Sequence, residues 1–502
     1  MQTTIRAEII SNFFIKTVIT AIVSIAITGF LCSNVFALSI SKEREIAVEF
    51  MDAIERQNKI IKDPMASALV SEIGEQILKA VPPQPFRFSF YVMDEDQFNA
   101  FAGPGSNIFV HRGLITSLDN VDELAGIIGH EIAHSSCRHI SSMVDQSKVM
   151  TIGTLAGVLA GVLLGAAGGS GGGAEFGQAV LVSSVAASQT AMLAYSRENE
   201  TEADQKGLVY LTNAGFDPKG LLTGLEKIRS RDWFGSETIP DYMKTHPGST
   251  ERIVYIQSWI EGRGKTSIDN PKKSIQPLKI DPFRFDMVKC RLAGMYGNED
   301  EALNMFNQML DKQPDNIAAN YGMALLMERK SRLDDSIKYL RKALESRAFD
   351  PYILLQLGRM NILKKEPQKA IDIMQGLETF PEVETEALFY LSQARLNAGM
   401  ADIAEIGFEK VINTAPKLFP KAYYHLAEIK GKSSNREDAA LSHYYLGIYY
   451  YEIQNMKSAK FHLMKSLETL SDKDKQNHAQ LIIAKSELRE REEKRESRQR
   501  RR

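Results

Sequence analysis

The segment DELAGIIGHEIAHSSCRH, residues 122–139, decides how the first half of this chain folds. Leucine, isoleucine and alanine recur in it at the spacing of an amphipathic helix, so we expect a helix over residues 122–142. His130 and His134 lie four residues apart and therefore share one helix face, about 6 Å apart along the axis. Both imidazoles can therefore reach a single zinc ion.

Glu131 follows the first of these histidines and lies about 100° round the helix from it. This position suits contact with a metal-bound water rather than with the metal itself. Zinc lowers the pKa of such a water to about 7, and a carboxylate can take its proton as it attacks a carbonyl carbon. The motif predicts metal-dependent hydrolysis with Glu131 as the catalytic base; a structural pair of surface histidines is the other interpretation.

A third zinc ligand is expected from the segment YSRENETEADQKG, residues 195–207, which should be helical. Glu200 and Asp204 are four residues apart and share one face, whereas Glu202 points away. We predict Glu200 as the third ligand and Asp204 as the acceptor of a hydrogen bond from a ligand histidine. Taken alone, such an acidic helix is more typical of a solvated surface.

The N-terminus has the layout of a secretory signal peptide, predicted over residues 1–37. Arg6 and Lys16 precede the uncharged run Thr17–Cys32, and Val35-Phe36-Ala37 offers a cleavage site with small residues. A retained membrane anchor is the alternative, although the run is near the lower limit for a spanning helix. The signal predicts an extracytoplasmic location.

Length, charge and cysteine content limit the number of domains and the kinds of partner that this chain can have. With 502 residues the chain should hold two or three domains. Lys+Arg 61 against Asp+Glu 63 leaves a net charge of -2, which gives no electrostatic reason to expect a nucleic acid partner. Cys137 and Cys290 are the cysteines beyond the signal, too few for a disulfide framework.

The C-terminal half repeats with a period of 34 residues. Small side chains mark each repeat, at Ala302, Ser336, Ala370 and Ala404. A larger apolar residue follows each by four positions: Phe306, Leu340, Met374 and Phe408. A small residue precedes each by twelve positions: Cys290, Ala324, Gly358 and Ser392. The pattern predicts tetratricopeptide repeats over residues 283–470, an all-α solenoid for binding peptides or proteins. A polar linker, 266–282, should precede it, and a charged helical or disordered tail, 471–502, should follow it.

An apolar insert, residues 149–195, separates the zinc-binding stretches. Val149–Gly169 has no charge and is long enough to span a bilayer. His134 before it and Glu200 after it must reach one zinc, so a single crossing is excluded. We expect a lid over the active site or a membrane-contacting interfacial helix; a paired transmembrane hairpin and an ordinary buried helix are the alternatives.

Two strands are expected in the first half, over Phe86–Met93 and Asn107–Val110, after a helical stretch at Ser41–Val81. The predicted fold is therefore mainly α with a small β-sheet. An α+β metallopeptidase domain over 38–265 should be followed by the helical solenoid.

HEIAH, the following pair Arg138-His139 and the downstream pattern E-x-x-A-D at 200–204 resemble the gluzincin peptidases, which include HtpX-like membrane peptidases and CAAX prenyl proteases. The stretch NAFAGPGSNIFVHRGL, residues 99–114, is similar to the strand segment before the zinc helix of that superfamily. With a signal peptide and C-terminal repeats, the whole mature chain resembles the beta-barrel assembly-enhancing proteases of the Gram-negative periplasm.

The resemblance implies one zinc ion per chain. It implies ligands at His130, His134 and Glu200, a catalytic base at Glu131 and support from Asp204. It also implies that an extended substrate adds as a further strand to an exposed edge formed by Asn107, Ile108, Phe109 and Val110. We interpret Arg138 and His139 as structural.

His246-Pro247 in the polar segment KTHPGSTER matches a His-Pro followed by an arginine, Arg252, in the same family region. One interpretation is that His246 stabilises the oxyanion. Another is that it occupies the vacant zinc position and holds the enzyme latent. A solvent-exposed loop histidine is the third.

The function that follows is a zinc endopeptidase that cleaves misassembled or stalled envelope proteins in the periplasm. The repeats would bind substrates or the outer-membrane β-barrel assembly machinery, and residues 149–169 offer a possible membrane contact. One alternative is a chaperone or scaffold that acts through the repeats. Another is a membrane stress peptidase of the HtpX type, which the cleavable signal and the repeats disfavour.

Overall fold

The computed structural model describes residues 38–57, 59–146, 195–233, 242, 246–247, 249–263 and 280–500. The predicted signal peptide, 149–194 of the apolar insert and most of the predicted linker lie outside the described residues. None of the helices within these ranges combines the length and apolar composition that a bilayer crossing requires.

A three-stranded mixed sheet lies in the N-terminal half. It consists of β1 (Ser89–Met93), β2 (Ala100–Gly103) and β3 (Asn107–His111), in the order β1-β3-β2. β1 runs parallel to β3, and β2 runs antiparallel to it. Gly105 and Ser106 have positive φ angles of 72° and 61°, which closes the tight β2–β3 hairpin.

The predicted substrate edge is wrong. Asn107, Ile108, Phe109 and Val110 belong to the central strand, which is paired on both sides, and all four residues are buried. A strand whose backbone groups already serve two neighbours cannot accept a third. The outer strand of the hairpin, β2, went unpredicted because its AFAG sequence lacks β-branched residues.

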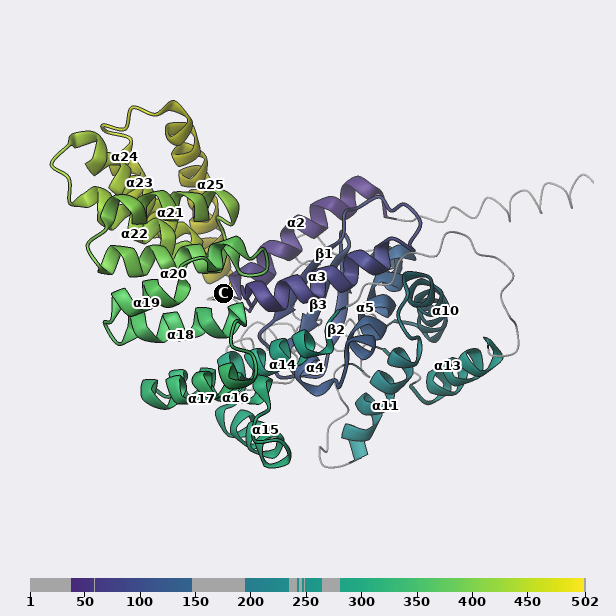
Figure 1. Ribbon diagram of the computed structural model, residues 1–502. Coiled ribbons are helices and arrows are strands. Elements are labelled where there is room, and N and C mark those ends of the chain that lie inside the picture. The colour runs from purple at the N-terminus through teal and green to yellow at the C-terminus, as the bar shows by residue number, and fades with distance from the viewer. Residues whose placement is uncertain are drawn as a thin grey trace, which may run out of the picture.

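Helices surround this sheet (Figure 1). Their bounds are α2 (Ile40–Arg56), α3 (Pro64–Leu78), α4 (Arg112–Ser117), α5 (Val121–Ser136), α6 (His139–Gln146), α10 (Arg197–Ala214), α11 (Lys219–Trp233) and α13 (Ser249–Arg263). The single helix expected over 41–81 is in fact α2 and α3. Pro64 starts the second of these, and the side chain of Asp63 caps it by accepting from the Ala66 N–H.

The zinc helix α5 is buried between α10 and α11, because glycines let the backbones approach. At Gly126 a Cβ atom would lie 2.5 Å from the Leu221 backbone nitrogen. At Gly207 it would meet the His130 Cα at 3.4 Å, so α10 lies directly against the first histidine. The expected helix over 122–142 breaks at Arg138, whose φ is 56°.

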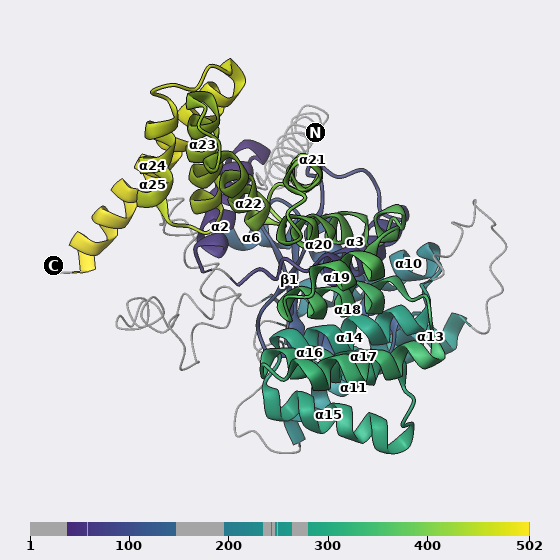
Figure 2. The same cartoon turned by 60° about the vertical axis from the view of Figure 1, so that its left-hand side comes forward.

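The C-terminal half is a stack of antiparallel helix pairs, which Figures 1 and 2 show as an arc beside the peptidase part. Its elements are α14 (Pro282–Tyr296), α15 (Glu299–Lys312), α16 (Ile317–Arg329), α17 (Leu333–Ser346), α18 (Pro351–Leu363), α19 (Pro367–Met374), η1 (Leu377–Thr379), α20 (Glu384–Asn397), α21 (Ala401–Thr414), α22 (Pro420–Gly431), α23 (Arg436–Glu452), α24 (Met456–Ser466) and α25 (Lys473–Arg500).

The 34-residue pattern correctly predicted this packing. A Cβ atom at Gly358 would lie 2.3 Å from Met374 Cγ, and one at Gly322 would lie 2.5 Å from the Phe306 ring. At these two positions a small residue therefore faces a large residue of the neighbouring helix, as the repeat requires.

The repeats pack directly on the peptidase part through α14. Arg291 is buried there and pairs with Asp63 at 2.6 Å and Glu386 at 3.1 Å. Nearer the surface, Arg284 donates two hydrogen bonds to Glu72, at 2.6 and 2.9 Å. The first of these networks joins α3 of the peptidase part to two different repeats.

Candidate metal centre

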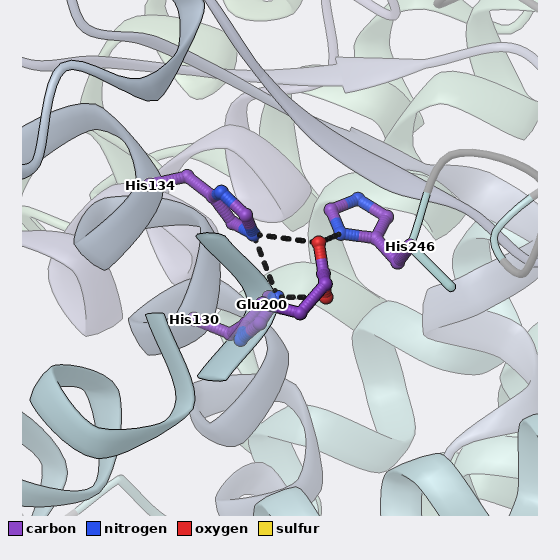
Figure 3. Close-up of side chains that lie close together, drawn as sticks. All are labelled: His130, His134, Glu200 and His246. Atoms are coloured by element: carbon purple, nitrogen blue, oxygen red, sulfur yellow. Dashed lines mark hydrogen bonds and ion pairs between the residues drawn. The ribbon is translucent and has the colours of Figure 1, made fainter. Parts of the chain in front are cut away.

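Three separate segments bring four potential ligands together (Figure 3). His130 and His134 come from α5, Glu200 comes from α10, and His246 precedes α13. One ligand atom of each lies within 4.8 Å of those of the others, and all four residues are buried. The structure therefore gathers the predicted ligand set, with His246 as a fourth member.

The distances inside the cluster are short. His130 Nε2 lies 2.9 Å from His134 Nε2. The two carboxylate oxygens of Glu200 lie 3.3 Å from His130 Nε2 and 3.2 Å from His134 Nε2. His246 Nδ1 lies 2.9 Å from Glu200 Oε1. Nitrogen and oxygen atoms thus converge on one point.

The donor set fits a zinc ion. Two imidazoles and a carboxylate are the ligands of a catalytic zinc site, in which the fourth position is left for water or substrate. Buried polar atoms without a hydrogen bond gather here: both Glu131 oxygens and His246 Nε2. Because buried polar atoms are normally paired, these atoms indicate that the pocket is built for a further group.

Glu131 projects into the same pocket from α5. One of its oxygens lies 3.6 Å from His246 Nε2. Burial raises the pKa of Glu131, against the opposing effect of His246 and His130. A raised carboxyl pKa brings the group closer to the range in which a general base works best.

Asp204 contacts a ligand histidine, as the helix spacing predicted. Its Oδ1 lies 2.9 Å from His130 Nδ1, the ring nitrogen on the side away from Glu200. A carboxylate in this position fixes the tautomer and the orientation of the ring. Burial opposes ionisation of Asp204, but Arg252 and His130 outweigh burial and lower the pKa of the carboxyl.

Arg252 is a site residue whose role the sequence does not indicate beyond its match to a family pattern. It lies on α13 and is buried, and it contacts Glu200 Oε2 at 2.6 Å. Burial raises the pKa of Glu200, yet His246, Arg252 and His134 overcome burial and hold it well below its usual range. The charged arginine therefore helps to keep Glu200 and Asp204 ionised in a buried site.

His246 is buried rather than exposed in a loop, so the solvent-exposed interpretation is wrong. Its ring stacks on Tyr242, with centroids 4.3 Å apart and an interplanar angle of 19°. The ring also faces both ligand histidines, at centroid distances of 5.4 Å to His130 and 5.1 Å to His134.

A second set of contacts orients His134 from the opposite side. Its Nδ1 lies 2.9 Å from His139 Nδ1, and His139 Nε2 lies 3.2 Å from Glu202 Oε2. Tyr195 stacks on the His134 ring, with centroids 3.8 Å apart. Glu202 does point away from the ligand cluster, as expected, but it reaches the cluster indirectly through His139.

Comparisons with known proteins agree with this geometry. Residues 65–260 match peptidase family M48, and residues 295–357 match the tetratricopeptide repeat. The first match contains the zinc helix, Glu200 and Arg252, and the second lies within the solenoid.

Two kinds of named protease are similar to this chain. The chain is 26% identical to the "Beta-barrel assembly-enhancing protease" of Yersinia pestis, over 73% of this chain and 79% of the relative. It is also 26% identical to the Escherichia coli (strain K12) protein of the same name, over 71% of this chain and 70% of the relative. Over 32% of its length it is 32% identical to the "Mitochondrial metalloendopeptidase OMA1" of Arabidopsis thaliana, covering 29% of that protein.

Proposed function

We propose that this chain, a zinc metalloendopeptidase with a peptidase family M48 domain and C-terminal tetratricopeptide repeats, cleaves misassembled or stalled proteins of the bacterial envelope. The observation that carries the proposal is the convergence of His130, His134 and Glu200 beside Glu131, whose buried oxygens have no hydrogen-bond partner. A scaffold that had lost catalysis would have no reason to keep a buried, unpaired carboxylate at this position.

The three predicted ligands, His130, His134 and Glu200, would hold the zinc ion. When bound, zinc supplies Lewis acidity and makes water a nucleophile at neutral pH. Glu131 accepts the proton of the attacking water at its free oxygens and returns it to the leaving amine. Asp204 and Arg252 do not touch substrate; they hold the His130 ring and the Glu200 carboxylate in place.

The substrate strand requires a corrected location. β2 is one of the two outer strands of the sheet and packs against α5, so it replaces Asn107–Val110 as the proposed edge. Its four residues are buried in this structure, so a substrate can pair there only after this edge is uncovered. The His111 N–H donates to the Asn99 carbonyl, so in this antiparallel pair Ala100 and Ala102 direct their backbone groups away from β3. An extended substrate paired there would lie beside the zinc helix.

His246 favours the latent interpretation over oxyanion stabilisation. It is buried within the ligand cluster and contacts Glu200, which leaves it where water or substrate would bind. We assign it the role of a latch that must move away before cleavage.

The relatives' name and the repeats support the choice of partners. The proposed substrates are unfolded or misassembled outer-membrane and periplasmic proteins, recruited by the solenoid or through the outer-membrane β-barrel assembly machinery. The proposed compartment is the periplasm, reached through the predicted signal peptide.

Replacing Glu131 by glutamine tests the proposal. Cleavage of fluorescently labelled casein should fall by about 10²–10⁴-fold, because the base is lost, while the zinc content stays at one per chain. Glu198→Gln, an exposed change on α10, is the matched control and should cleave normally. If Glu131→Gln still restores envelope protein assembly in cells lacking the wild-type protein, the chain acts as a scaffold instead.

A further inference from the structure

Cys137, His139 and Glu202 form a second group of metal-ligating side chains, which we term the outer cluster. One ligand atom of each lies within 4.8 Å of those of the others. The group lies one hydrogen bond from the catalytic centre, because His139 Nδ1 is 2.9 Å from His134 Nδ1. It shares no residue with the catalytic ligand set.

The backbone between α5 and α6 builds this cluster. Cys137 caps the end of α5, and Arg138 then adopts a left-handed conformation, with a φ of 56°. Such a conformation is unfavourable for arginine and is held here by its bonds to the Leu38 carbonyl and Glu43, each at 2.7 Å. The reversal turns His139 back toward α10, where it meets Glu202.

We propose that the outer cluster binds a transition metal ion such as zinc, and that this second ion inhibits the peptidase. A thiolate, an imidazole and a carboxylate are all zinc ligands, and a sulfur ligand selects zinc, cobalt or cadmium over magnesium and calcium. His139 is buried, whereas Cys137 and Glu202 remain partly accessible, so an ion can enter from solvent.

A cation already neutralises this cluster. Lys206 donates to Glu202 Oε1 at 2.8 Å, and its ammonium group also acts electrostatically on the Cys137 thiol. The lysine side chain is 43% exposed, so it can swing into water when a metal ion takes over the same two partners. A divalent ion would satisfy the same partners more strongly and add His139 as a third.

The inhibition follows from counting protons between two rings. A neutral imidazole has one N–H and one lone pair. With zinc on His134 Nε2, the proton of that ring lies on Nδ1 and is donated to His139 Nδ1, so His139 carries its own proton on Nε2 and donates it to Glu202. His134, His139 and Glu202 thus form a chain of hydrogen bonds in which each histidine donates to the next residue.

An outer ion on His139 Nε2 displaces that proton. The proton of His139 must then lie on Nδ1, where it faces the N–H of His134 across 2.9 Å. Two donors cannot share a hydrogen bond, so the contact that orients the catalytic ligand breaks. By linkage, the two ions weaken each other's binding by the same factor. This coupling rests on the proposed catalytic site, whereas the outer site itself does not.

Cobalt titration of the purified full chain tests the site. We expect a second equivalent of Co²⁺ with thiolate-to-cobalt charge-transfer absorption, since the catalytic ligand set contains no sulfur. Cys137→Ser should abolish the absorption and weaken the second equivalent at least about tenfold, the scale on which even outer partners of a metal matter. Cys290→Ala is the control, because Cys290 is buried within the repeats, and it should leave the absorption unchanged.

Glu202→Gln is a second variant and should also lower the affinity for the second Co²⁺ ion. Absorption that is absent from the wild type, or that persists in Cys137→Ser, overturns the outer site. The same titration in His130→Ala, whose catalytic set is broken, should still show the absorption, so the site is tested even if the chain does not cleave casein.

Zinc inhibition tests the coupling. Zinc added beyond one equivalent should slow casein cleavage by the wild type. Cys137→Ser should cleave at the same basal rate, and its half-maximal inhibition should require at least about a tenfold higher zinc concentration. Equal inhibition of both proteins would overturn the coupling.

Discussion

Arg252 donates two parallel hydrogen bonds to Asp204, from Nε to Oδ2 and from Nη2 to Oδ1, each 2.8 Å long. Asp204 in turn holds the His130 ring through Nδ1 at 2.9 Å. The arginine comes from α13 and the aspartate from α10, so this contact locks two helices together behind a metal ligand. The orientation of His130 therefore depends on a residue 122 positions away in the sequence.

The two parallel hydrogen bonds from Arg252 to Asp204 should strengthen zinc binding. Arg252→Lys keeps the charge but cannot make two parallel bonds to one carboxylate. Zinc affinity, measured by competition with a chelator, should fall about 10–100-fold, as it does when an outer partner of a ligand is lost. Arg197→Lys, at an exposed arginine near the same site, should leave the affinity unchanged. Equal zinc affinities for the wild type, Arg252→Lys and Arg197→Lys would show that the paired bonds from Arg252 to Asp204 stabilise the fold and do not affect zinc binding.

The sequence predicted the parts of the site that depend on local spacing. His130 and His134 share a helix face, and so do Glu200 and Asp204, because four residues make about one turn. Arg252 and Tyr195 carry no such periodic signal, since their contacts arise only when α13 and the start of α10 fold back on the zinc helix. Their role could not be derived from spacing within one element.

The sheet shows the same limit. NIFV at 107–110 was recognisable as a strand from its β-branched and aromatic residues, but strand order is a property of the whole sheet. The AFAG stretch at 100–103 became a strand only by pairing with its neighbour across a tight turn. The repeats were predicted more fully, because each helix pair contacts its sequence neighbours and the 34-residue period encodes those contacts directly.

The second prediction separates the two roles of His246. If His246 is a latch, His246→Ala should raise the rate of casein cleavage. The rate should rise about tenfold for each 1.4 kcal/mol by which His246 stabilises the latent state. Zinc content should stay at one per chain, because His130, His134 and Glu200 remain. A loss of about 10²–10³-fold in kcat would instead show that His246 stabilises the oxyanion.

The third prediction tests the outer strand. Ala102 directs its N–H away from β3, so Ala102→Pro removes that donor without breaking the ladder of the hairpin. Losing one substrate hydrogen bond of about 0.5–1.5 kcal/mol should lower kcat/KM by up to about tenfold. Ala102→Ser has a similar size and keeps the N–H, so it should behave like the wild type. Unimpaired cleavage by the proline variant would move the substrate to another surface.

The fourth prediction concerns the joint between peptidase and repeats. Arg291 donates from Nε to Asp63, from Nη1 to the Tyr321 hydroxyl and from Nη2 to Glu386. Both carboxylates are buried. Arg291→Ala therefore leaves two buried negative charges without their partner, and its free energy of unfolding should fall by about 3–5 kcal/mol in urea.

Arg284→Ala supplies the matched comparison on the same helix, α14. Its partner Glu72 has a side chain that is 40% exposed, and an ion pair of this kind contributes about 0–1 kcal/mol. The two variants remove the same side chain and differ mainly in the burial of the carboxylates left behind. Unequal losses would show that buried charges hold the repeats to the peptidase. Equal losses would show that the apolar contacts of α14 with α3 and α4 hold the joint, and that Arg291 only satisfies the groups that those contacts bury.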